Sequence, residues 1–186
     1  MLTFAWLALT ALGCGQAFTD RQPTEQTYVG PLGSTGALVA VTAQDGRFRA
    51  YVCGDDATRA TYTQWFDGTL SDGAGSAKGG ELVLELKQRS ATKVVGTIER
   101  AGTRVSFELR TPEGAGGFWA AKGELCATGL IALDDGRVQG AYCSAPLVRS
   151  QVVPVRPPAE GDENLAVYLG AGRSQEWLKR VSLNGQ

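Results

Sequence analysis

Histidine is absent from the 186 residues of the chain. Because histidine is the commonest general base in enzymes and the commonest ligand of transition metals, its absence excludes Ser-His-Asp and Cys-His mechanisms of nucleophilic catalysis. Long runs of one charge are also missing, since 18 Lys and Arg residues are interspersed with 19 Asp and Glu residues. A chain without a basic run offers little to a phosphate backbone, and we expect no nucleic-acid partner.

Metal-binding patterns are equally scarce. The four cysteines include no close pair such as C-x-x-C, which zinc sites commonly use. The Gly-rich stretch Asp72–Glu81 supplies oxygen ligands loosely like a calcium loop but lacks the alternating acids of that motif. The sequence therefore predicts neither a metal nor another cofactor.

Alternation of apolar and polar residues with period two dominates from Tyr28 to Val155. In "RVSFELR", for example, Val105, Phe107 and Leu109 point to one face of a half-buried strand. The 25 glycines fall between such runs, and pairs such as Asp-Gly predict hairpin turns. We expect an all-β fold in which eight to ten short strands form a single antiparallel meander over residues 28–155. Such a sheet would close into a small up-and-down barrel, with a β-sandwich as the alternative.

The character of the chain changes after Val155. Proline and acidic residues in "PVRPPAEGDEN" predict an irregular linker, so residues 156–186 are interpreted as a linker and a C-terminal segment. A strand is expected at Leu165–Leu169. Ser174 and the apolar stripe of Trp177, Leu178 and Val181 predict one short C-terminal helix, with a frayed tail as the alternative.

The first thirteen residues carry no charged side chain and are followed by Cys14. They are too short to span a membrane but have the length of the apolar region of a signal peptide. "ALGC", ending at Cys14, resembles the lipobox of bacterial lipoproteins, although Ala11 replaces the usual Leu and no basic residue precedes the apolar run. The resemblance implies a signal peptide at 1–13, lipidation of Cys14 and a polar tether at 14–27. The alternative is a buried N-terminal strand or helix with an ordinary core cysteine.

Cysteine spacing suggests a disulfide between Cys126 and Cys143, which an exported protein could form. A four-residue loop at Leu133–Gly136 would place Ala132 opposite Arg137 and the two cysteines directly across the same hairpin. Closing this loop would contribute about 3 kcal/mol in the chain-entropy model.

Cys53 is the competing partner for Cys143. "DGRFRAYVC" ends at Cys53 and is echoed by "DGRVQGAYC", which ends at Cys143. The segments that follow the two cysteines do not match, so the echo is better explained by two hairpins that reuse the same turn residues. Cys53 is then expected to be a buried thiol without a chemical role.

Aromatic side chains are the best candidates for ligand binding. Tyr62, Trp65 and Phe66 lie together in "YTQWFDGTL", and Trp119 follows in "GFW". On a strand, Tyr62 and Phe66 share one face and Trp65 lies on the other. A barrel mouth lined in this way could hold a small apolar ligand, whereas the alternative is that these rings fill the core of the barrel.

Carboxylates are the remaining candidates for catalysis. Asp55 and Asp56 stand together in a loop after a strand, and Asp67 and Asp72 flank "GTLS". Paired acids of this kind could serve glycoside hydrolysis. Acids in Gly-rich turns are more often turn formers in contact with water. A carboxylate-dependent hydrolase is therefore an alternative function, and a structural accessory subunit of an envelope complex is another.

The stretch "AYVCGDD…TQWFDGTL", Ala50–Leu70, is similar to a pattern in uncharacterised exported proteins and lipoproteins of bacteria. The resemblance covers about twenty residues and implies compartment and fold, not an activity. Together with the lipobox it favours a non-catalytic lipoprotein of the cell envelope, anchored to the membrane by its lipid and facing the periplasm or the exterior. Its expected partner is a small ligand or an envelope protein.

Overall fold

The computed structural model describes residues 24–146, 148–170 and 174–184. The expected all-β class is confirmed, because strands make up nearly all of the regular structure and the one helix assigned in these ranges, α1 (Arg59–Tyr62), is a single turn. The predicted signal peptide, Cys14 and most of the predicted tether lie outside the described residues. Within the described ranges, no helix is long and apolar enough to cross a membrane.

The first half of the chain forms an eight-stranded antiparallel sheet in the order β4-β3-β2-β1-β8-β7-β6-β5. Its strands are β1 (Gln26–Pro31), β2 (Leu38–Gln44), β3 (Arg47–Cys53), β4 (Gln64–Thr69), β5 (Ala74–Gly79), β6 (Leu82–Ser90), β7 (Lys93–Arg100) and β8 (Thr103–Arg110). The two edge strands, β4 and β5, lie side by side and are joined by a bridge between Ser71 and Ala74, so this sheet nearly closes into a barrel.

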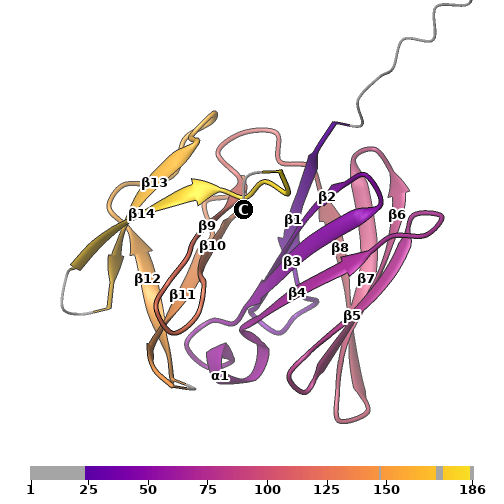
Figure 1. The fold of residues 1–186 in the computed structure, drawn as a ribbon, viewed down its shortest axis with the longest axis horizontal. Coiled ribbons are helices and arrows are strands. Elements are labelled where there is room, and N and C mark those ends of the chain that lie inside the picture. The colour runs from indigo at the N-terminus through magenta and orange to yellow at the C-terminus, as the bar shows by residue number, and fades with distance from the viewer. Residues whose placement is uncertain (1–23, 147, 171–173, 185–186) are drawn as a thin grey trace, which may run out of the picture.

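The second half forms a closed barrel of six antiparallel strands in the order β10-β11-β12-β13-β14-β9. Its strands are β9 (Gly117–Ala121), β10 (Thr128–Ala132), β11 (Val138–Ala145), β12 (Val148–Pro154), β13 (Asn164–Leu169) and β14 (Ser174–Arg180). Figure 1 shows this barrel beside the first sheet, with β9 and β10 closest to β1 and β3.

Buried apolar side chains form three cores. The first fills the eight-stranded sheet and includes Phe48, Phe66, Leu84, Ile98 and Leu109. The second lies between the two sheets and includes Tyr51, Cys53, Phe118, Ile131 and Val181. The third fills the six-stranded barrel and includes Trp119, Leu130, Val152, Leu165 and Leu178. Each strand near the junction supplies two cores, because its successive side chains point to opposite faces.

The single meander of the sequence prediction is thus replaced by two sheets. Strand β2 shows why, since Val39 and Val41 belong to the first core while Leu38 and Ala40 belong to the second. A strand buried on both faces is apolar throughout and does not alternate. Residues 28–155, expected as one barrel domain, instead cover the first sheet and four strands of the second barrel (β9–β12), which β13 and β14 beyond Val155 complete.

The expected C-terminal helix is wrong, because Ser174–Arg180 is the strand β14. Leu178 points into the barrel and its neighbours Trp177 and Lys179 do not, which is the alternation of a strand. A stripe of three apolar residues is too short to establish a helical period, and the pairing of Ser174–Lys179 with β13 decides in favour of the strand. The strand expected at Leu165–Leu169 is confirmed within β13.

The predicted disulfide between Cys126 and Cys143 is confirmed, with the two Cα atoms 5.7 Å apart, and Cys53 is a buried free thiol. The register differs from the expectation by one residue, since Ala132 pairs with Val138. Cys126 precedes β10 and lies in the loop after β9, so it is outside the ladder and can still reach β11.

Candidate binding groove

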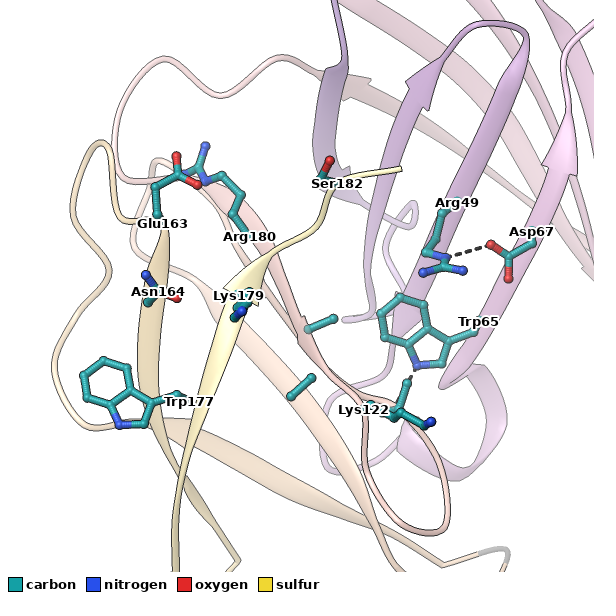
Figure 2. Close-up of a pocket in the computed structure, with 13 residues that line it drawn as sticks. Arg49, Trp65, Asp67, Lys122, Glu163, Asn164, Trp177, Lys179, Arg180 and Ser182 are labelled. Carbon is teal, nitrogen blue, oxygen red and sulfur yellow. Dashed lines mark hydrogen bonds and ion pairs between the residues drawn. The ribbon is translucent and has the colours of Figure 1, made fainter. Parts of the chain in front are cut away.

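A groove of about 990 Å³ lies where the first sheet meets the second barrel (Figure 2). Strands β3 and β4 supply one wall through Arg49, Trp65 and Asp67. The other wall comes from β9, β13, β14 and the residues next to them. Its lining residues are Ala120, Ala121, Lys122, Ala127, Glu163, Asn164, Trp177, Lys179, Arg180 and Ser182.

Trp65 is the aromatic centre of the groove. Its ring stacks on Tyr51 and Phe118, with centroid separations of 4.4 and 5.4 Å. Tyr51 and Phe118 are themselves nearly parallel and fully buried, so Trp65 lies over them at the edge of the second core. The rings come close to β10 because Gly129 has no side chain, since a Cβ there would lie 2.6 Å from the Tyr51 ring.

One hydrogen bond holds the orientation of the Trp65 indole. Its N–H donates to the backbone carbonyl of Ala127, 3.2 Å away on the opposite wall. The indole N–H of Trp65 therefore has a hydrogen-bond partner within the protein, and the indole ring remains partly exposed to the groove.

The opposite wall is shaped by the short ladder between β14 and β9. Only Lys179 and Arg180 of β14 pair with β9, opposite Ala120 and Trp119. The strands separate beyond this point, and Lys122 and Trp177 are left on the two sides of the opening. Trp177 is 62% exposed and lies at the outer margin of this wall in Figure 2.

The groove gathers positive charge. It continues into a smaller hollow that shares Arg49, Asp67 and Ser182 and adds Arg47. In the described part of the chain, five basic side chains (Arg47, Arg49, Lys122, Lys179 and Arg180) and two acidic ones (Asp67 and Glu163) line the groove and the hollow, whereas the whole chain carries a net charge of -1. A concentration of one sign in a concave surface attracts ligands of the opposite sign.

These basic groups differ in what they contact. Arg49 forms an ion pair with Asp67, 2.7 Å between Nε and Oδ1. Arg180 donates to the carbonyl of Asp162 and lies over the Trp119 ring, so it also braces the barrel. Among the described residues, no carboxylate lies within ion-pair distance of Lys122 or Lys179. Their charges are available to a ligand.

The other aromatic residues singled out in the sequence do not line the groove. Phe66 is 2% exposed and belongs to the first core, and Trp119 is fully buried in the third, where its N–H donates to the carbonyl of Asp162. Tyr62 ends α1 and packs against the first core. Phe66 and Trp119 follow the alternative in which these rings fill the core, and Trp65 alone of the four lines the groove.

Sequence reasoning missed Trp177, Lys122 and Lys179. The sequence predicts Trp177 in the apolar stripe of a helix, whereas on β14 it is exposed because its neighbour Leu178 takes the buried face. The two lysines lie 57 positions apart in the numbering of the chain and are brought to one surface by the pairing of β14 with β9. No local pattern in the sequence marks them.

The three candidate catalytic carboxylates do not lie together in one site. Asp55 accepts hydrogen bonds from the backbone N–H and the hydroxyl of Thr58, and the Thr58 hydroxyl lowers the pKa of this carboxyl. Asp56 pairs with Arg59 of α1. Asp55 and Asp56 thus hold the loop before α1, and Asp67 alone of the three lines the groove.

Cys53 lies in the second core. Burial raises the pKa of its thiol to about 11, although hydrogen bonds to Tyr51 and Thr63 oppose the shift. A thiol that stays protonated at neutral pH is a poor nucleophile. In the described part of the chain, no group of three Cys, Asp or Glu side chains is arranged to hold a metal ion.

Comparison of the chain with protein-family models, with curated proteins and with solved structures found no match. The fold and the groove are therefore the observations from which a function can be argued.

Proposed function

We propose that this protein is a non-catalytic lipoprotein of the bacterial cell envelope, and that it binds a ligand in the groove between its two β units. The observation that carries the proposal is the groove itself. One wall carries Trp65, whose indole is fixed by a hydrogen bond, and the other carries Lys122 and Lys179, which have no carboxylate partner among the described residues. A concave surface with apolar area and a few convergent polar groups is the usual form of a ligand site.

Anchoring through Cys14 is part of the proposal. The carboxylate of Glu25 accepts hydrogen bonds from the Ser182 hydroxyl, at 2.9 Å, and from the Leu183 N–H, at 2.6 Å. Ser182 lines the groove, so the chain that precedes β1 is attached beside the groove. A tether from Cys14 to Glu25 extends at most about 40 Å, which would keep the groove near the membrane surface.

An exposed apolar patch supports a second contact, with an envelope protein, in addition to the ligand in the groove. Strand pairing places Trp177 on β14 opposite Ala166 on β13, and the N–H of Val155, the residue after β12, donates to the Ala166 carbonyl, so these three residues form a cross-strand row. Val153 lies two residues before Val155, on the same face of the sheet and opposite Tyr168. Val153, Val155 and Trp177 are exposed, and such a patch can contact another envelope protein.

The hydrolase alternative has less support. Asp55 and Asp56 are engaged in the loop before α1, and Asp67 is paired with Arg49. If Asp67 served catalysis, Asp67→Asn would abolish turnover of a bound glycan and leave its binding intact. If the protein only binds, the glycan is recovered unchanged from the wild type.

The experiment is a thermal-shift screen of purified protein against envelope components, including glycans, lipids, peptides and small anions. A ligand of the groove raises the melting temperature of the wild type, because binding to the native state alone stabilises it. The same compound should shift Lys122→Ala and Trp177→Ala much less. Val153→Ser, at an exposed apolar residue that does not line the groove, is the control. A panel that shifts the wild type and the groove variants equally would contradict the proposed site.

Anchoring has its own test. The intact mass of protein purified from a bacterial membrane fraction should correspond to an acylated chain that begins at Cys14. After free-thiol labelling without reduction, one thiol, Cys53, should be labelled once the chain is denatured. An unprocessed chain without lipid would contradict the envelope assignment.

A further inference from the structure

We propose that the ligand of the groove is an acidic glycan, that is, an oligosaccharide carrying carboxylate or other acid groups. This inference rests on the proposed binding function and gives the ligand its chemical class. It is argued from the charge of the groove, from its aromatic surfaces and from the polar groups between them.

The positive charge of the groove indicates a negatively charged ligand. Lys122, at the end of β9, and Lys179, on β14, face the groove without carboxylate partners among the described residues. Arg47 extends the positive surface into the adjoining hollow. An anion placed between the two lysines would be attracted by two ammonium groups that have no carboxylate partner among the described residues. Acid groups spaced along a chain could also reach Arg47.

The aromatic rings of the groove indicate that the uncharged part of the ligand consists of sugar rings. The Trp65 ring is held on its inner side by Tyr51 and Phe118, so the partly exposed remainder of the indole forms a flat, fixed surface. Trp177 offers a second, more exposed indole at the margin. The face of an indole carries negative π density and attracts polarised C–H groups, and one face of a sugar ring presents a set of such groups.

The polar residues of the groove fit hydroxyl groups. Asn164 offers an amide that donates and accepts, and Glu163 offers an accepting carboxylate. A ligand with many hydroxyl groups can use such a mixed set, whereas an acyl chain would leave it unsatisfied. The combination of lysines, indoles and hydrogen-bonding side chains is therefore more suited to a sugar acid than to a lipid tail.

The shape of the groove favours a chain over a compact molecule. The volume of about 990 Å³ lies at the upper end of small-molecule sites, and the adjoining hollow lengthens the surface along β3 and β4. Residues from β3, β4, β9, β13 and β14 line the groove, so a chain could lie along the junction between the two β units.

The test uses a labelled oligogalacturonate, in which every sugar carries a carboxylate, and measures its binding to the purified protein by fluorescence anisotropy. The fully methyl-esterified oligomer is the neutral probe of the same length. We expect the acid form to bind at least about tenfold more tightly, and binding to weaken as salt is raised from about 0.05 M to about 0.5 M, since salt screens exposed charges.

Charge-reversal variants locate the binding. Lys122→Glu with Lys179→Glu should weaken binding of the acid oligomer by more than about tenfold. The matched control is Lys78→Glu with Lys87→Glu, which makes the same change in net charge at exposed positions on β5 and β6 and should leave binding within about twofold. Circular dichroism before each titration confirms that both double variants are folded.

Three results would overturn the inference. Equal binding of the acid and esterified oligomers would show that charge is not recognised. Equal weakening by the two double variants, or equally tight binding of a single-stranded oligonucleotide, would show attraction without a site. Binding of an acidic peptide in place of the glycan, lost in Lys122→Glu with Lys179→Glu, would overturn the ligand class while leaving the proposed binding function intact. That function itself fails only if the groove variants change the binding of no compound in the thermal-shift screen.

Discussion

Trp65 on β4 donates its indole N–H to the carbonyl of Ala127, 3.2 Å away, in the loop that leads into β10 of the other barrel. The same ring stacks on Tyr51 of its own sheet and on Phe118 of the second barrel. One side chain thus joins the two β units and also forms part of the surface of the groove. Effects on folding and on binding have to be separated at this residue.

Substitution of Trp65 should therefore cost stability in two steps. Trp65→Phe keeps a ring over Tyr51 and Phe118 but loses the hydrogen bond, and should lower the free energy of unfolding by about 1 kcal/mol. Trp65→Ala also leaves a cavity and should lower it by about 3 kcal/mol or more. Urea denaturation followed by circular dichroism measures both.

Trp177 provides the control for this prediction. It is exposed and donates no hydrogen bond to a described residue, so Trp177→Ala should change the free energy of unfolding by less than about 0.5 kcal/mol. If Trp65→Ala were as mild as Trp177→Ala, the role of Trp65 in joining the two β units would be wrong.

The disulfide should stabilise the second barrel by restricting the unfolded chain. Cys126 and Cys143 are 17 positions apart, and the chain-entropy model assigns such a loop about 3 kcal/mol. Cys126→Ser with Cys143→Ser should lower the free energy of unfolding by about that amount. Adding a reductant should then destabilise the wild type and have no effect on the double variant, and a reductant effect on both would show that the bond is not the cause.

The raised pKa of the Cys53 thiol predicts that the protein loses stability in alkaline solution. Burial raises the pKa of its thiol from an ordinary value of 9.0 to about 11 in the folded state. The folded chain therefore holds this proton more tightly than the unfolded chain. The resulting stabilisation is complete below about pH 9 and is lost as the pH rises from about 9 to about 11, with a slope of up to about 1.4 kcal/mol per pH unit.

Comparison with Cys53→Ala isolates this effect. Burial also raises the pKa of Tyr51, which remains in the variant, so the informative quantity is the difference between the two slopes. The free energy of unfolding, measured in urea at several pH values from 8 to 11 or so, should fall more steeply in the wild type. Parallel curves would contradict the buried, protonated thiol.

Much of the fold follows from local patterns. The alternation in "RVSFELR" and the hairpin signal at Asp45-Gly46 correspond to β8 and to the turn between β2 and β3, where both turn residues have positive φ. What local patterns did not show is that the strands divide between two sheets. The signal for this was the continuous apolar run of β2, since only burial on both faces removes the alternation.

The sequence predicts less of the candidate site than of the fold. The sequence predicts that Trp65 and its neighbour Phe66 point to opposite faces of a strand, and in the structure Phe66 lies in the first core while Trp65 packs against the second. The charge of the groove could not be recognised, because Arg49, Lys122 and Lys179 are scattered through a chain of nearly balanced charge. They meet only because β14 returns to pair with β9 beside β3 and β4.

The most direct test of the groove as a binding site is an NMR titration of the tryptophan indole N–H signals with oligogalacturonate, each signal being assigned from a single Trp→Phe variant. Trp65 and Trp177 line the groove, whereas Trp119 is fully buried in the third core and serves as an internal reference. We predict that the Trp65 and Trp177 signals shift together and saturate, while the Trp119 signal stays in place. Saturable binding that leaves both groove signals unmoved, or moves only that of Trp119, would contradict a ligand site between the two β units.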